Sequence, residues 1–217
     1  AWTAEFDDPS RAESAVAMLR ALVDPPSDPA RAREALTRHR AVIIAAARAA
    51  LAFPEGHAQV LSSLSSPGRF APLVDRDDPE AESVRRVVIQ ELAPQLAPLA
   101  AAVDPARRRL VLRVLADADA PEALAALVRA VDDAAAADAE AALRALASRE
   151  SDLGPNAARV SSRLAPESPW SLRLAAVEAL AHTPGAAQSL SRVLDGARVA
   201  WVRGAAVAGL ARARDDV

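Results

Sequence analysis

The chain has 217 residues, no cysteine and a formal net charge of −3. The lack of cysteine excludes disulfides, thiolate metal sites and cysteine nucleophiles, and the slightly acidic balance counts against a nucleic-acid partner, whose phosphates require a basic surface. Apolar residues make up 52% of the chain but aromatic residues only 3%. Because alanine is the commonest residue, this composition favours helices packed on helices, and we expect an all-α protein with almost no strand.

Two helices are expected in the first quarter of the chain. Residues 10–23 and 29–53 carry apolar side chains at helical spacing, with Met18, Leu19 and Leu22 in the first and Ile43 and Leu51 in the second. We interpret residues 1–56 as N-terminal helices that are either a cap or degenerate repeats. Residues 57–217 are expected to form a repeat array that is continuous with them.

One short pattern recurs five times after residue 80. In residues 84–93, Arg85 is followed by apolar residues three, four and seven positions later, which lie on one face of a helix. Related segments occupy residues 107–116, 138–147, 172–181 and 202–211, and the segment at 138–147 has alanine at the arginine position. The aligned positions 85, 108, 139, 173 and 203 are 23, 31, 34 and 30 residues apart. This spacing is typical of a repeat of two helices.

Shorter apolar helices are expected between these segments, over residues 92–103, 123–131, 157–164 and 186–194. Acidic turns precede the recurrent helices, as in Asp77-Asp78-Pro79, Asp104-Pro105 and Asp132-Asp133. Aspartate accepts hydrogen bonds from the free N–H groups at a helix start, and proline suits the first turn. We therefore interpret the acidic residues as helix caps rather than as ligands or catalytic groups.

The order of helix, acidic turn and apolar-arginine helix resembles a HEAT repeat, including the HEAT-like repeats of phycobilin lyases. The resemblance covers residues 57–217. It implies a right-handed α-solenoid of antiparallel helix pairs in which the second helices line a concave face. It also implies a ladder in which Arg85, Arg108, Arg173 and Arg203 pair with acidic turn residues.

The register predicts which residues form the core and how strongly the arginines act. We expect the following residues to be mostly buried: Val88, Ile89, Leu92, Val111, Leu112, Leu115, Leu143, Leu146, Val177, Leu180, Val207 and Leu210. We expect each arginine pair to be exposed and to contribute only about 0.2 to 1 kcal/mol. Gly204 and Gly209 lie within the last recurrent helix, where we expect them to permit close packing.

Two groups of side chains are candidates for binding. Trp170 lies two residues before one recurrent segment and Trp201 directly before the next, and tryptophan is a common anchor at protein interfaces. We favour the alternative that both fill the gap between a turn and the next helix. Arg107, Arg108 and Arg109 form the densest basic run, which we interpret as a solvated helix face with a ladder role rather than a phosphate site.

The sequence offers no constellation for catalysis. His39, His57 and His182 are far apart and none belongs to a zinc-ligand pattern, so we assign them capping or surface roles. No glycine-rich phosphate loop or nucleophile elbow occurs, and no apolar run is long enough to span a membrane. We expect no catalytic residue, no metal and no cofactor.

Three classes of function follow from these expectations. The first is a noncatalytic scaffold that binds a protein or peptide on its curved surface. The second is a HEAT-like enzyme, such as a DNA glycosylase or a phycobilin lyase, and the third is a structural spacer in a larger protein. The chain begins at Ala1, so a processed bacterial envelope protein, a cytoplasmic protein and a fragment all stay open.

The last recurrent helix does not resemble a cap. Trp201, Gly204 and Ala208 lie outside its predicted inner face of Val202, Ala206, Val207 and Leu210, yet they are small or apolar. Since the ends of a solenoid need polar caps to stay soluble, we expect this end to be covered by another subunit, a partner or further repeats. Self-association through the C-terminal end is one form of this prediction.

Overall fold

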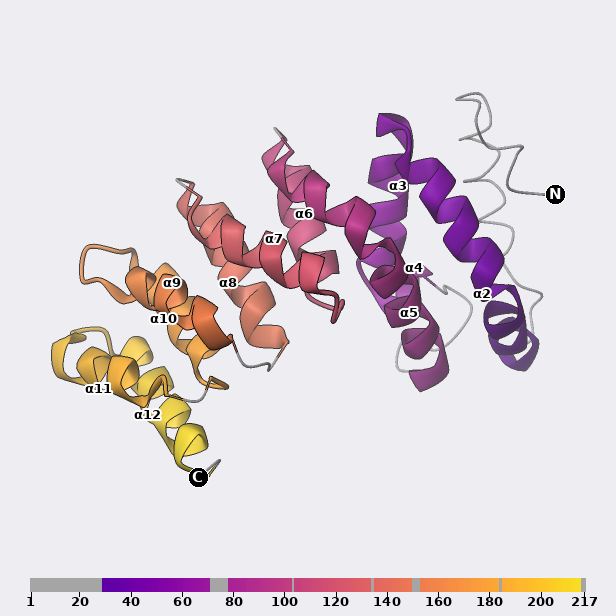
Figure 1. Cartoon of the computed structure of the whole chain (residues 1–217). Coiled ribbons are helices and arrows are strands. Elements are labelled where there is room, and N and C mark those ends of the chain that lie inside the picture. Colours follow the sequence, from indigo (N-terminus) through magenta and orange to yellow (C-terminus); the bar gives the residue numbers. More distant parts are fainter. Residues whose placement is uncertain are drawn as a thin grey trace. The chain divides into compact units, whose positions relative to one another are not determined.

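The computed structural model describes residues 29–70, 78–102, 104–133, 135–149, 153–183 and 185–215. Within these ranges the regular elements are all helices and no strand occurs (Figure 1). This confirms the expected all-α class. The helix predicted over residues 10–23 lies outside the described residues.

The chain divides into two compact units. Residues 1–99 and 117–120 form the first unit, and residues 100–116 and 121–217 form the second. The boundary that the sequence suggested at residue 56 falls within helix α3 (Pro54–Leu64). Whether residues 1–56 act as a cap stays a prediction.

The described part of the first unit is built around two long helices, α2 (Pro29–Leu51) and α5 (Pro79–Leu96), which pack against each other. Arg48 of α2 pairs with Glu91 of α5 at 2.9 Å, and the Thr37 hydroxyl donates to Glu80 at 3.0 Å. The short helices α3 and α4 (Pro67–Phe70) connect them. The core of this unit includes Ile43, Leu61, Leu64, Ile89 and Leu92, all almost fully buried.

Helix α5 is longer than the sequence predicted. The expected break at Leu92 is absent, because the helix continues through Pro94 to Leu96 and then tightens into the 3-10 helix η3 (Ala97–Ala101). Proline removes one N–H donor from the helix, yet the apolar side chains of Leu92 and Leu96 are completely buried. Packing therefore keeps this segment helical, and the described residues 92–102 form no separate α-helix.

The second unit consists of short helices in two sets. The recurrent segments form α6 (Pro105–Leu115), α8 (Ala136–Ser148), α10 (Trp170–Leu180) and α12 (Ala200–Asp215). The intervening segments form α7 (Pro121–Val131), α9 (Ala157–Ser161) and α11 (Ala187–Gly196), with 3-10 turns η4 (Gly154–Asn156) and η5 (Ser162–Leu164) around α9.

Each recurrent helix of this unit packs against the next one. Helix α8 contacts α6 and α10, and α10 contacts α12. The intervening helices cover them, since α7 packs on α8, α9 on α10 and α11 on α12 (Figure 1). The recurrent helices therefore follow one another as direct neighbours within the unit.

The acidic turns cap some helices but not all. Asp78 caps α5 by accepting hydrogen bonds from the backbone N–H groups of Glu80 and Ala81, and Asp104 caps α6 through Ala106. These two caps confirm the prediction. The N-cap positions of α8 and α10 are Ala135 and Pro169, which form no side-chain cap.

The predicted core is correct except at the last helix. Residues from Val88 to Leu180 in the predicted set are at most 1% exposed. Leu210 is only half-buried, and the expectation for Val207 is wrong, because its side chain is 56% exposed. Helix α12 instead buries Val202, Ala206 and Gly209 against its neighbours. Val207 lies away from that face, and no described element covers it.

Candidate functional site

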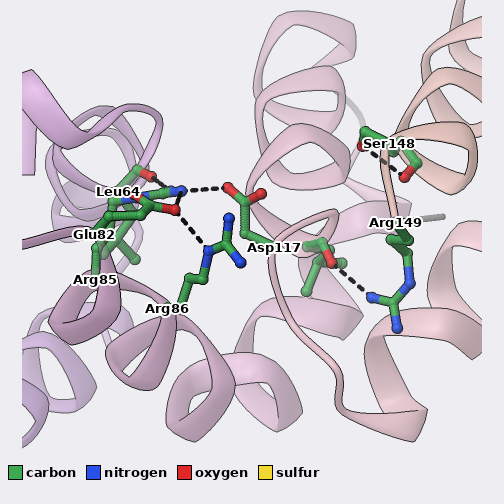
Figure 2. Close-up of polar contacts among 9 residues, drawn as sticks. Leu64, Glu82, Arg85, Arg86, Asp117, Ser148 and Arg149 are labelled. Carbon is green, nitrogen blue, oxygen red and sulfur yellow. Dashed lines mark hydrogen bonds and ion pairs between the residues drawn. The ribbon is translucent and has the colours of Figure 1, made fainter. Parts of the chain in front are cut away.

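The most extensive polar cluster of the first unit surrounds Arg85 (Figure 2). Its Nε and Nη2 atoms donate to both carboxylate oxygens of Glu82 at 2.7 and 2.8 Å. Nη2 also donates to Asp117 at 2.7 Å, and Nη1 donates to the Leu64 carbonyl at 2.7 Å. The Arg85 side chain is only 4% exposed, so this cluster ties α3, α5 and the turn at Asp117 together inside the unit.

The charges of this cluster shift one another's pKa values. Burial alone would raise the pKa of Glu82, but hydrogen bonds from Arg85 and Arg86 outweigh it and lower that pKa below its ordinary value. Burial would likewise lower the pKa of Arg85, but hydrogen bonds to Glu82 and Asp117 raise it. The lowered pKa of Glu82 and the raised pKa of Arg85 both favour the charged forms, so this ion pair stabilises the fold.

The sequence predicted exposed arginine pairs, but this expectation is wrong for Arg85, whose side chain is buried. Its guanidinium is buried, and it donates to the carbonyl of Leu64 at the end of α3 and to the carboxylate of Asp117. Glu82 was not anticipated as a partner. The sequence could have indicated this pair, because Glu82 lies three residues before Arg85 and such a spacing puts both side chains on the same helix face.

Arg108 occupies the equivalent place on α6. It forms an ion pair with Asp138, a buried residue in the first turn of α8, and Asp133 lies 3.8 Å from its Nη1 atom. Nη1 also donates to the carbonyl of Ala102 at 3.3 Å. The start of one recurrent helix thus supplies the carboxylate for the arginine of the preceding one.

The other members of the basic run differ in environment. Arg109 is 45% exposed at its side chain, and its Nη1 atom lies 3.7 Å from Asp138. Arg107 is half-buried. One carboxylate, Asp138, therefore meets two of the three arginines, which leaves little of the run free for a phosphate.

A further arginine links neighbouring recurrent helices of the second unit. Arg149, at the C-terminal end of α8, donates from Nη1 to the carbonyl of Leu115 at 3.3 Å (Figure 2). Leu115 is the last residue of α6. The carbonyl at the C-terminal end of α6, which has no partner within its own helix, thus accepts a hydrogen bond from the arginine at the end of α8.

The last two arginines of the predicted ladder differ from the first two. Arg173 on α10 is 8% exposed, and its Nε atom is buried without a hydrogen-bond partner. Arg203 on α12 is exposed, and no described residue forms an ion pair with it. Arg85 and Arg108 thus have acidic partners, whereas none is present for Arg173 and Arg203 in the described part of the chain.

The two candidate tryptophans lie at the start of neighbouring helices. Trp170 is the first residue of α10 and 54% exposed, and Trp201 is the second residue of α12 and 75% exposed. The favoured interpretation, that both fill packing gaps, is therefore wrong. Both indoles are therefore largely accessible to solvent.

Other candidate chemistry is sparse. His57 holds the carbonyl of Leu51 through Nε2 at 3.0 Å, which is a helix-capping role at the end of α2. His182 lies beside Arg212, with 3.5 Å between its Nε2 atom and Nη1 of the arginine. In the described ranges no three histidine or acidic side chains gather as a metal site would require, and none of the helices there could cross a membrane.

Comparisons with known proteins give little further information. No family model and no curated protein matches the chain. Among solved structures, it is similar to the crystal structure of an engineered protein that was a target of the Northeast Structural Genomics Consortium. The two are 19% identical, with a TM-score of 0.48 over 94% of this chain and 96% of that one.

Proposed function

We propose that the protein is a noncatalytic scaffold of HEAT-like repeats that binds a protein partner on the surface of its recurrent helices. The observation that carries this proposal is the pair of exposed tryptophans, Trp170 and Trp201, on recurrent helices that pack against each other. Tryptophan has a large apolar surface whose exposure to water is unfavourable, and it is enriched among the residues that contribute most of the binding free energy at interfaces. Two exposed indoles in a chain with only 3% aromatic residues favour an interface.

The arrangement of the helices supports the same proposal. Direct packing between successive helices α6, α8, α10 and α12 is how a right-handed α-solenoid of antiparallel helix pairs would place its second helices, and such arrays provide extended binding surfaces. The arginine clusters are occupied by carboxylates and serve the fold. The outer positions of the recurrent helices are therefore the surface left for recognition.

Affinity capture from the cells that produce the protein tests this proposal. The intact wild-type chain, a Trp170→Ala/Trp201→Ala variant and an Arg129→Ala/Arg192→Ala control would be used as baits. The control residues are exposed on α7 and α11. We expect a protein that the wild type and the control retain and the tryptophan variant loses.

Two results would contradict the proposal. Equal retention of the same partner by all three baits would exclude the tryptophan surface. Capture of nucleic acid in place of a protein would favour the glycosylase-like alternative. Circular dichroism of each bait would establish that the substitutions leave the helices intact, as their exposure leads us to expect.

A further inference from the structure

Arg173 is buried in the first turn of α10, yet no described residue pairs with it. It is 8% exposed, and its Nε atom has no hydrogen-bond partner. Nε of Arg108, at the equivalent place on α6, also lacks a partner, so the two arginines differ at their Nη atoms. Those of Arg108 bind the carboxylate of Asp138 and the carbonyl of Ala102, whereas those of Arg173 bind no described group. A buried charge without such compensation is unfavourable.

Helix α12 covers Arg173 without supplying a carboxylate from its described side chains. Arg203, at the equivalent place on α12, is exposed, and no described helix follows it. This difference indicates that Arg173 is buried by α12, which packs against α10. Asp138, the partner of Arg108, is the third residue of α8, whereas the third residue of α12 is the buried Val202. An apolar residue thus stands where the earlier helix supplies an acid.

The Nη atoms of Arg173 stay within reach of a ligand. Nε is the one guanidinium nitrogen of this residue that is both fully buried and unpaired. Since no described group binds Nη1 or Nη2, these two nitrogens retain some contact with solvent. Glu140 of α8 lies near the start of α10, but it binds the Ser171 hydroxyl at 2.7 Å and pairs with Arg144. A guanidinium edge that is free in this way can donate two parallel hydrogen bonds to one carboxylate.

The two exposed tryptophans lie close to Arg173 along the recurrent helices. Trp170 is three residues before it on α10, a spacing that places both side chains on neighbouring parts of the helix surface. Trp201 is the second residue of α12, the helix that packs against α10. A ligand that reaches the Nη atoms of Arg173 is therefore expected to meet indole surface as well.

We propose that Arg173 binds a carboxylate side chain of a protein partner whose neighbouring apolar residue contacts Trp170 and Trp201. The inference rests on the proposed function, since it names the chemistry of the partner at the tryptophan surface. Arg85 and Arg108, the buried arginines that have acidic partners, both bind carboxylates. Phosphate groups on proteins are recognised by clusters of arginines, whereas α10 contains one arginine.

Thermal unfolding of the intact protein tests whether Arg173 is unpaired. Arg173→Met should raise the melting temperature by about 2 °C or more, because an apolar side chain replaces an uncompensated buried charge. Arg108→Met is the matched comparison and should lower the melting temperature, because Asp138 loses a partner. An unchanged or lower melting temperature for Arg173→Met would mean that the chain itself already compensates this charge, and it would overturn the inference.

A phage-displayed library of random peptides is the probe for the partner's chemistry. Selection on the immobilised wild type is expected to enrich sequences that place aspartate or glutamate beside an apolar residue. Fluorescence anisotropy would then compare one selected peptide, acetylated and amidated at its ends, with its amide analogue, in which glutamine or asparagine replaces the acid. The analogue should bind the wild type about tenfold more weakly or worse. Arg173→Met should bind both peptides equally, and Arg192→Met, an exposed position on α11, should keep the preference.

Equal affinity of the two peptides for the wild type would overturn the inference, and so would a selection that does not enrich acidic residues. Two further outcomes separate it from the function on which it rests. Peptides that require Trp170 and Trp201 but bind Arg173→Met as tightly as the wild type would refute the carboxylate site alone. A preference for the acidic peptide that persists at full affinity in Trp170→Ala/Trp201→Ala would refute the tryptophan surface alone.

Discussion

Arg85 and Arg86 are adjacent in the sequence but contribute very differently to the fold. The Arg85 side chain is 4% exposed and that of Arg86 is 65% exposed, although both bind Glu82. We expect Arg85→Ala to lower the free energy of unfolding by about 1.5 to 3 kcal/mol, because charge-assisted hydrogen bonds in a buried setting are lost. Arg86→Ala should cost at most about 1 kcal/mol. Urea denaturation of the two variants checks this difference, and equal losses would contradict it.

The lowered pKa of Glu82 predicts a dependence of stability on pH. A carboxyl whose pKa is lower in the folded state adds stability above its unfolded pKa of about 4.3, and this contribution is lost as the pH falls through the folded pKa. The stability difference between the wild type and Glu82→Gln should therefore be largest near neutral pH and shrink below about pH 4. Urea denaturation at a series of pH values measures it. A difference that stays constant down to about pH 3 would exclude this role of Glu82.

Gly56 marks a close approach of two helices. A Cβ atom added there would lie 2.1 Å from the carbonyl oxygen of Ala50, which belongs to the backbone of α2 and cannot move aside cheaply. Gly56→Ala should therefore destabilise the protein by about 1 to 3 kcal/mol, as overpacking does. Gly196→Ala is the control, since nothing lies within 4 Å of its added Cβ. Thermal melting of both variants compares them, and equal melting temperatures would contradict the contact.

At the scale of the helix, two apolar residues on neighbouring recurrent helices differ in how far their side chains are buried. Leu180 on α10 is completely buried, whereas Val207 on α12 is 56% exposed. Leu180→Ala should cost about 2 to 5 kcal/mol through lost contacts and the cavity left behind. Val207→Ala should stay within about 0.5 kcal/mol of the wild type. Thermal unfolding of both variants tests this difference. An unchanged melting temperature for Leu180→Ala would show that the face of α10 that carries Leu180 does not pack as described.

Periodicity predicted most of these helices because it depends only on nearby residues. The spacing of Leu112 and Leu115, or of Val177 and Leu180, identifies one helix face without knowledge of the rest of the chain. The same spacing placed Val207 in the core incorrectly. A pattern shows which residues share a face, but the exposure of that face depends on which element packs against it.

The polar contacts were less predictable for a related reason. The partners of Arg85 and Arg108, Asp117 and Asp138, lie 32 and 30 residues further along the chain. Which carboxylate meets which arginine depends on how successive helices dock, and spacing alone does not specify it.

The packing of the two glycines of α12 also depends on neighbouring helices. Gly209 is close-packed against Leu190 and Ala181, whereas Gly204 has open space beside it. Close packing was therefore predicted correctly for Gly209 and incorrectly for Gly204.

At the scale of the whole molecule, the charges of the last helix bear on its assembly. The sequence suggested self-association through the C-terminal end, but the exposed cation Arg203 lies one helical turn before Val207, on the same side of α12. Two copies that met through this face would repel each other. We therefore expect light scattering across a concentration series to give the mass of a monomer, 22.6 kDa. A mass that rises with concentration in the wild type and not in Val207→Glu would contradict this.

The uncovered side of α12 also bears on how such a chain can lengthen. A helix pair joined after α12 would place a helix against residues that are already apolar, namely Val207 and Leu210. No existing core residue would have to change, because repeat proteins are stabilised by contacts between neighbours. The side of α12 that carries Val207 is therefore a place where a designer could join an additional helix pair.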